Sequence, residues 1–164
     1  MTLAFTVYGV PQPKGNLRAF MKRGMKFPIV TDSNRNARSW SQLVAEGANR
    51  AIGALPRQDR ALMFASAIRL SVAFYLPRPK KYQKRGLGIA HLTAPDIDKL
   101  VRAILDALTQ VAWGDDSQVV ELLTTKAYAD VDAPPRADIR VERTTGAHPV
   151  VVPPAPLPLL ELVP

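Results

Sequence analysis

One stretch of sequence decides how this chain is interpreted: Asp96-Ile97-Asp98-Lys99-Leu100-Val101-Arg102-Ala103-Ile104-Leu105-Asp106-Ala107-Leu108, followed by Gly114-Asp115-Asp116-Ser117-Gln118. Pro95 disfavours helical backbone before it, so a helix is expected to begin at Asp96 or Asp98. Apolar residues then recur at the i, i+3, i+4, i+7 spacing of a core-facing helix. Gly114 is expected to end the helix, and a strand is expected over residues 119–128.

Five carboxylates fall within this stretch, although the chain as a whole is basic. Each has a simple structural explanation: an Asp can cap a helix, worth about 1 kcal/mol, an Asp can initiate a turn, and Asp98 with Arg102 can form an exposed ion pair. A cap, however, needs one Asp and not Asp-x-Asp. Adjacent carboxylates also repel each other unless a cation neutralises them. The clustering therefore predicts a site for a hard divalent metal ion.

Carboxylate oxygens favour Mg²⁺, with Mn²⁺ as the alternative, over softer metals. The expected ligands are Asp96, Asp98 and Asp116, and Asp115 is the adjacent alternate. Arg102 is expected to hold a phosphate oxygen and to balance charge that develops there. These expectations make Asp96, Asp98, Asp116 and Arg102 the predicted catalytic residues. Asp106, two turns into the helix, is expected to play a supporting or structural role, and the number of metal ions stays open.

Three separated blocks occur in the order found in a known nuclease family. They are Pro95-Asp96-Ile97-Asp98 with Leu100 and Arg102, then Leu105-Asp106-Ala107-Leu108, then Asp115-Asp116-Ser117-Gln118-Val119. The opening Tyr8-Gly9-Val10-Pro11-Gln12-Pro13-Lys14-Gly15 fits the same pattern. In these motifs the sequence resembles the RusA family of Holliday-junction resolvases, which are crossover junction endodeoxyribonucleases. The resemblance covers residues from about 2 to 143.

The resemblance implies a Mg²⁺-dependent enzyme of DNA recombination and repair that resolves four-way junctions by paired symmetric nicks. It also implies a homodimer, whose two equivalent sites would match the two cuts. Two positions depart from the family pattern. Lys99 stands where the family usually has Asn, and Arg102 stands where it has a functional Lys. Arg keeps the charge needed to clamp a phosphate, but it cannot donate a proton.

Charge and composition point to a polyanionic partner. The net charge is +8 and the pI is about 10.1, a balance typical of nucleic-acid-binding domains. Two basic segments, together with Lys99, supply the predicted DNA contacts: Lys14, Arg18, Lys22 and Arg23 in the first, and Lys80, Lys81, Lys84 and Arg85 in the second. The first is expected to form a hairpin from strands 17–21 and 25–30, with Phe27 in the core. The alternative for both segments is a solvated surface.

The predicted fold is α+β, with a small mixed sheet of about five strands and two main helices over it. Strands are expected at residues 2–10, 67–76 and, as an edge strand, 137–142, because apolar residues alternate there. A further strand is expected over residues 119–128, after the acidic turn. Residues 54–65 are expected to be a link and carry no chemical signal. The domain is expected to span residues 1–145, followed by a Pro-rich, disordered and dispensable tail over residues 146–164.

Several classes of function are disfavoured. The chain has no cysteine, which excludes disulfides and thiolate zinc sites. Its only histidines are His91, expected in a loop, and His148, so a Ser-His or Cys-His nucleophile is not expected. No stretch is long enough to span a membrane and no secretory pattern opens the chain, so a cytoplasmic, nucleoid-associated protein is expected, with a phage origin as a further hypothesis.

Three alternatives stay open beside the resolvase. The first is a non-catalytic DNA-binding protein of the same fold, which would keep the basic segments and need no metal. The second is a nuclease of the Pro-Asp…(Asp/Glu)-x-Lys type, although no acid-x-Lys follows at the start of a strand. The third is a phosphatase with an Asp-x-Asp motif, although residues 88–95 form a poor hydrophobic strand before the motif.

Overall fold

The computed structural model describes residues 2–15, 17–21, 23–27, 29–83 and 89–144, with the backbone alone at residues 17, 18, 20 and 29–32. Its elements in chain order are β1 (Thr2–Tyr8), β2 (Leu17–Phe20), β3 (Ile29–Asp32), α1 (Ala37–Gly53), α2 (Arg57–Phe64), β4 (Ile68–Leu76), the 3-10 turn η1 (Lys80–Tyr82), α3 (Ile97–Leu108), the 3-10 turn η2 (Asp116–Gln118), β5 (Val119–Tyr128) and β6 (Arg136–Arg143). The expected α+β class is confirmed.

The main sheet has four strands in the order β1-β6-β4-β5. β4 and β5 are parallel and are joined through α3, while the other pairs are antiparallel. Parallel neighbours need a long crossover connection, and α3 provides it. β2 and β3 pair only with each other as a separate hairpin, so the sheet is one strand smaller than expected.

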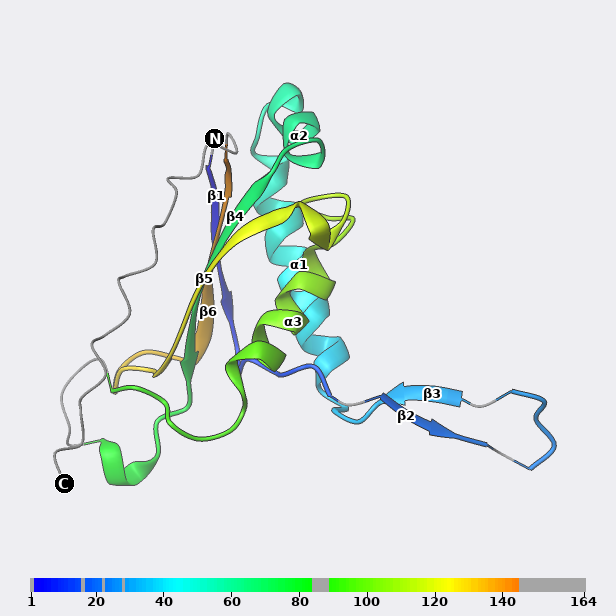
Figure 1. Ribbon diagram of the computed structural model, residues 1–164. Helices are drawn as coiled ribbons and strands as arrows, with labels where there is room; N and C mark the ends of the chain where they lie inside the picture. The colour runs from blue at the N-terminus through cyan, green and yellow to red at the C-terminus, as the bar shows by residue number, and fades with distance from the viewer. Residues whose placement is uncertain (1, 16, 22, 28, 84–88, 145–164) are drawn as a thin grey trace, which may run out of the picture.

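Helices α1 and α3 lie on the same side of the sheet (Figure 1), where α1 packs against β1 and α3, and α3 packs against β5. Alternating side chains of β4 and β6, such as Leu70, Val72 and Ile139, are buried beneath them. Leu100, Ile104 and Leu108 supply the buried stripe of α3. The stripe was predicted correctly because its spacing needs only one helix face to be apolar.

Several local predictions were wrong. β6 was expected at an edge, but it pairs with β1 on one side and β4 on the other, so the edges are β1 and β5. Residues 54–65 gave no signal, yet α2 forms there and buries Met63. α3 ends at Leu108 and not at Gly114, because Gln110 adopts φ 63° and its N–H bonds to the Trp113 carbonyl at 2.7 Å.

Phe27 was expected in the core, but it is 79% exposed on the connection between β2 and β3. The hairpin stands away from the body (Figure 1), so its side chains cannot reach the core. Residues 84–88 and 145–164 lie outside the described residues, as do the predictions for Lys84, Arg85 and the tail. Among the described residues, no helix combines the length and apolar character needed to cross a membrane.

Candidate active site

The polar face of α3 forms one wall of a hollow that we call the acidic hollow. The wall is built by Asp98, Arg102 and Asp106, which stand four residues apart and therefore share one helix face. Asp116 closes the hollow from η2, and Leu122 and Thr124 of β5 form the opposite side. The hollow measures about 460 Å³, which is room for a phosphate group and several waters.

Asp116 is held in place by two neighbours. The Thr109 hydroxyl and the Trp113 indole N–H, the latter at 3.2 Å, both hydrogen-bond its Oδ1. Trp113 is fully buried, so the ring that donates this bond is fixed by packing. A carboxylate oriented through one oxygen can present the other oxygen to a ligand, an arrangement typical of metal ligands.

Asp115 has a different role from its neighbour. Its carboxylate accepts the Ser117 backbone N–H at 2.9 Å and caps η2. Hydrogen bonds from the hydroxyl and the backbone of Ser117 lower the pKa of Asp115. Asp115 does not line the acidic hollow. Of the two adjacent acids, the geometry therefore favours Asp116 as the ligand.

Gln118 ties this turn to the body of the protein. Its side-chain oxygen accepts the N–H groups of Gly114 at 2.7 Å and Asp115 at 3.1 Å, while its amide donates to the carbonyls of Phe64 and Ser66, both at 3.0 Å. One side chain thus joins the acidic turn to the end of α2 and the start of β4. This tether fixes where Asp116 stands relative to α3.

Asp96 lies apart from the other two predicted ligands. It is the N-cap residue of α3, makes no side-chain cap hydrogen bond, and pairs with Lys99 at 3.1 Å. It lines a second hollow with Pro95, His91 and Lys99, whereas Asp98 faces the acidic hollow. Asp96 precedes the helix with extended backbone (ψ 143°), whereas Asp98 lies in the first turn, which separates the two acids of the Asp-x-Asp motif.

The acidic hollow offers carboxylate oxygens to a divalent ion. The described residues contain no group of three acidic or histidine side chains close enough to hold a metal ion. Asp98 and Asp116 do share one hollow. Mg²⁺ is commonly held by one or two carboxylates together with waters and substrate phosphates, and not by an all-protein cage. The residues therefore fit Mg²⁺ or Mn²⁺ as a two-carboxylate site that substrate would complete.

Two residues outside the predicted set support the turn before α3. Lys126 of β5 donates to the carbonyls of Thr93 at 2.9 Å and Pro95 at 2.8 Å. His91 is buried, stacks on Tyr128 with ring centroids 4.5 Å apart, and has Nδ1 3.1 Å from the Thr93 carbonyl. Burial lowers the pKa of His91, and the charge of Lys126 lowers it further. The sequence offered one indication of this role, because Lys126 is a charged residue at a strand position that faces inward.

A second cluster of charges, the basic hollow, adjoins the acidic one. It is lined by Lys14, Asn34, Arg35, Ala37, Arg38, Ser41 and Asp106. Lys14 Nζ lies 2.6 Å from Asp106 Oδ2, so Asp106 links the two hollows. Arg35 and Arg38 stand at the start of α1, whose first turn has no acid. Cations at a helix N-terminus oppose the helix dipole, a mild cost that a bound phosphate would offset.

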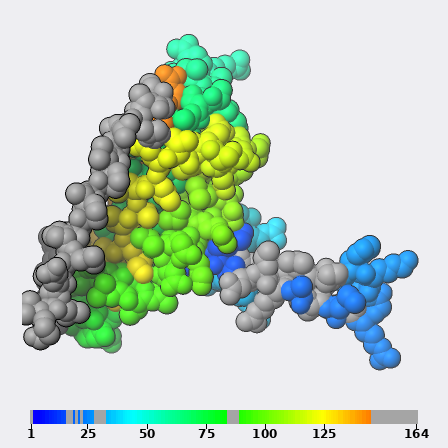
Figure 2. Space-filling view, viewed as in Figure 1, coloured from blue at the N-terminus to red at the C-terminus, as the bar shows by residue number. Residues whose placement is uncertain are grey.

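The other predicted DNA-binding residues are spread over the surface. Arg23 is exposed on the hairpin connection, which projects from the body in Figure 2. Lys80 and Lys81 are exposed on η1, with the Lys81 ammonium 4.8 Å from the Tyr82 ring centroid. Lys99 is engaged by Asp96. The side chains of Arg18 and Lys22 lie outside the described residues.

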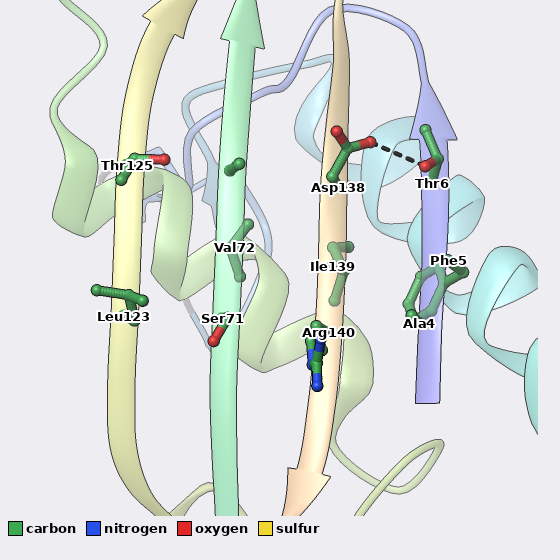
Figure 3. A pocket seen from close by; sticks show the side chains of 11 residues that line it. Ala4, Phe5, Thr6, Ser71, Val72, Leu123, Thr125, Asp138, Ile139 and Arg140 are labelled. Carbon is green, nitrogen blue, oxygen red and sulfur yellow. Dashed lines mark hydrogen bonds between the residues drawn. The ribbon is translucent and has the colours of Figure 1, made fainter. Parts of the chain in front are cut away.

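A further hollow lies on the opposite face of the sheet and is not a candidate for the chemistry. Its lining comes from all four strands and is mainly apolar, with Phe5, Val72, Leu123 and Ile139 beside a few polar side chains (Figure 3). Asp138 is the one acid in its lining, and it already accepts from Thr6 at 2.8 Å and Arg136 at 3.2 Å. Among the described residues, this hollow therefore offers no pair of open carboxylates.

Comparison with known proteins bears on the same residues. The family model described as "Endodeoxyribonuclease RusA" matches residues 9–142. A protein of Bacillus subtilis (strain 168) named "Uncharacterized protein YqaN" is 26% identical, over 88% of this chain and 98% of that protein. The match to the family model spans the acidic hollow, the basic hollow and the hairpin.

Proposed function

Because the chain belongs to the RusA family of endodeoxyribonucleases, we propose that it is a divalent-metal-dependent nuclease that resolves four-way DNA junctions by paired symmetric nicks. The observation that carries the proposal is the acidic hollow, where Asp98, Asp116 and Arg102 line one space. Two carboxylates and a guanidinium are suited to a metal ion and the phosphate it acts on.

Asp98 and Asp116 are proposed to hold Mg²⁺ or Mn²⁺. When bound, the ion would supply charge stabilisation at the phosphate and lower the pKa of a coordinated water. Thr109 and Trp113 keep Asp116 in one orientation. Arg102, exposed on the same helix face, binds a non-bridging phosphate oxygen through its planar fork.

The reaction is the hydrolysis of one phosphodiester. A bond forms between phosphorus and the water oxygen, and the bond from phosphorus to the 3′ oxygen breaks. The water loses a proton and the departing 3′ oxygen gains one, which leaves a 5′-phosphate and a 3′-hydroxyl. Arg102 cannot supply that proton, because its guanidinium stays charged. Its role is confined to binding and to balancing the charge that develops on the phosphate.

Asp96 is proposed as a ligand that joins the site once DNA is present. Its partner Lys99 is half-exposed and forms an ordinary surface ion pair, which is worth little and can be exchanged. A DNA phosphate offers Lys99 an alternative partner and would leave the Asp96 carboxylate open. This interpretation accounts for a lysine at a position where the family usually has Asn.

Basic residues outline a path for the DNA. The basic hollow, with Lys14, Arg35 and Arg38, shares Asp106 with the acidic hollow, so phosphates bound there would lie next to the cleavage site. Junction preference is proposed to come from DNA shape and deformability, and not from base contacts. A C2 homodimer would give the two symmetric cuts. Residues 1–145 are proposed to suffice for activity, and residues 146–164 to be dispensable.

The test is incubation of the protein with an end-labelled four-way junction, with and without Mg²⁺. We expect paired symmetric nicks that require the metal. Asp98→Asn and Asp116→Asn should each reduce the cleavage rate at least 1,000-fold, on the order of the losses seen for essential catalytic groups. Asp96→Asn should also abolish cleavage while junction binding persists. Asp132→Asn, which changes an exposed acid in the turn before β6, is the matched control and should cleave normally.

A non-catalytic DNA-binding protein is the second candidate, and the Asp96–Lys99 pair is the observation that favours it. That protein would bind the junction tightly and leave it intact in both Mg²⁺ and Mn²⁺. If the double change Lys99→Asn, Arg102→Lys then restored nicking, the departures from the family pattern would be the cause of the lost activity. Persistent binding without cleavage in both proteins would rule out the nuclease.

A further inference from the structure

We propose that the hairpin of residues 17–32, which we call the arm, inserts its apolar tip into the open base stack at the branch point of the junction. This inference rests on the proposed function and adds a recognition device to it. It assigns a role to three exposed apolar side chains that neither the core nor the acidic hollow uses.

The arm is built to reach away from the body. Its strands pair only with each other, from Leu17 opposite Asp32 to Phe20 opposite Ile29. The arm projects from the rest of the molecule in both views (Figures 1 and 2). Gly24 turns the tip with φ 92°, a conformation that glycine adopts without strain. β2 is four residues long, and the seven residues from Leu17 to Arg23 can extend by at most roughly 23 Å.

The tip carries large apolar side chains in water. Phe27 is 79% exposed, Met21 is 68% exposed and Met25 is 49% exposed. Single exposed apolar residues are common, but three within seven residues at the end of a projecting hairpin form a patch. Such a patch is typical of a surface that is covered when a partner binds.

Charge identifies the partner as a polyanion. Residues 14–31 contain five cations, namely Lys14, Arg18, Lys22, Arg23 and Lys26, and no acid. Arg23 and Lys26 are exposed beside the apolar tip. Duplex DNA attracts the cations, but its stacked bases admit an apolar side chain only at the cost of unstacking a base step. A branch point interrupts that stack and presents base faces on which aromatic side chains can pack.

The base of the arm stands beside the proposed cleavage site. Lys14, which precedes β2, pairs with Asp106 of the acidic hollow, and Asn34, which follows β3, lines the basic hollow. A reach of roughly 23 Å corresponds to about seven base pairs at 3.4 Å each. The arm and the acidic hollow can therefore contact the same junction, with the tip at most roughly 23 Å from the base of the arm.

The experiment uses a four-way junction with 2-aminopurine at the branch point, and the same label in the linear duplex as a comparison, both without divalent metal. Fluorescence reports unstacking, and titration gives the affinity. The variants are Phe27→Ser and Met25→Ser. Val131→Ser is the matched control, because it removes an equally apolar side chain, 54% exposed, on the turn between β5 and β6.

We expect the wild type and Val131→Ser to raise the fluorescence at the branch point and Phe27→Ser to abolish the rise. Junction affinity of Phe27→Ser should fall about tenfold, a loss typical of one removed base–aromatic stack, while duplex affinity changes less than twofold. Met25→Ser should show a smaller loss of the same kind, and both variants should keep the hydrodynamic mass of the wild type.

Other outcomes overturn the inference and separate it from the proposed function. Junction-selective binding with no rise in fluorescence, or with an equal rise in Phe27→Ser, would exclude the wedge and leave the resolvase intact. A fall in hydrodynamic mass in Phe27→Ser would identify the tip as a contact between protein copies instead. Equal affinity of the wild type for junction and duplex would refute the proposed junction selectivity and the wedge together.

Discussion

The ammonium of Lys126 lies 2.8 Å from the carbonyl oxygen of Pro95. This bond connects β5, an edge strand of the sheet, to the last residue before the Asp-x-Asp motif. Together with the bond from the same ammonium to Thr93, it holds the turn from which α3 begins. The positions of Asp96 and Asp98 therefore depend on a residue that bears no carboxylate.

Lys126→Met should slow cleavage more than it weakens binding. Loss of two hydrogen bonds from a charged donor should lower the free energy of unfolding by about 2 kcal/mol. We expect the single-turnover rate to fall 10- to 100-fold and metal-free junction affinity to stay within twofold. Lys126→Arg, which retains the charge and several donors, should recover part of the rate. Equal losses of rate and affinity would indicate a general structural defect.

Lys99→Asn should lower the Mg²⁺ concentration needed for half-maximal cleavage, by about two- to fivefold. The change removes a positive charge 3.1 Å from Asp96 and leaves that carboxylate open to a cation. Metal titrations of the cleavage rate would measure the effect. Arg57→Asn removes an exposed cation at the start of α2, which lines neither hollow, and should leave the Mg²⁺ requirement unchanged. An unchanged requirement in Lys99→Asn would contradict the proposed role of Lys99.

Gln118→Leu should destabilise the protein by about 2–3 kcal/mol, because backbone groups of Gly114, Phe64 and Ser66 lose their partners. Cleavage should also slow, since the turn that carries Asp116 would lose its tether. Urea denaturation measures the first effect. Gln83→Leu, a change at an exposed position after η1, serves as the control and should leave stability within about 0.5 kcal/mol of the wild type.

Stability should fall as the pH is lowered through the range in which an unfolded histidine titrates. Burial, and then the charge of Lys126, lower the pKa of His91 in the folded state. Below about pH 6.5 His91 binds a proton in the unfolded chain but stays neutral in the folded protein. Its contribution to the free energy of unfolding is therefore present above that pH and is lost as the pH falls below it. Denaturation at pH 7.5 and 5.5 should show this loss, and His91→Gln should reduce it. A loss of equal size in His91→Gln would assign the effect to other groups.

Local patterns in the sequence predicted much of the fold. The apolar stripe of α3 is a property of one helix, and alternation in β1, β4 and β6 is a property of one strand. Helix α2 could not be predicted from an apolar stripe, because among its residues only Met63 is buried. The place of β6 inside the sheet depends on which strands pair with it, and a single strand's pattern does not contain that information.

For the candidate site as well, some features follow from the sequence and others only from the tertiary structure. The clustered carboxylates and the family resemblance of their motifs predicted Asp96, Asp98 and Asp116 as site residues. The structure brings Asp98 and Asp116 to one hollow with Arg102, and it places Asp96 beside Lys99. Asp106 was expected in a supporting role, and its contact with Lys14 joins residues 92 positions apart that no local pattern could connect.

By itself, the sequence determined the chemistry of this protein: its charge, its carboxylate donors, and the periodicities that form α3 and the strands, because these follow from residue type and local spacing. Only the tertiary structure decided which acid shares a hollow with which, that Lys126 and Gln118 position the turns, and that the arm carries Phe27 into solvent. Those outcomes depend on packing and hydrogen bonds between distant segments, whose energies arise only when the whole chain is folded.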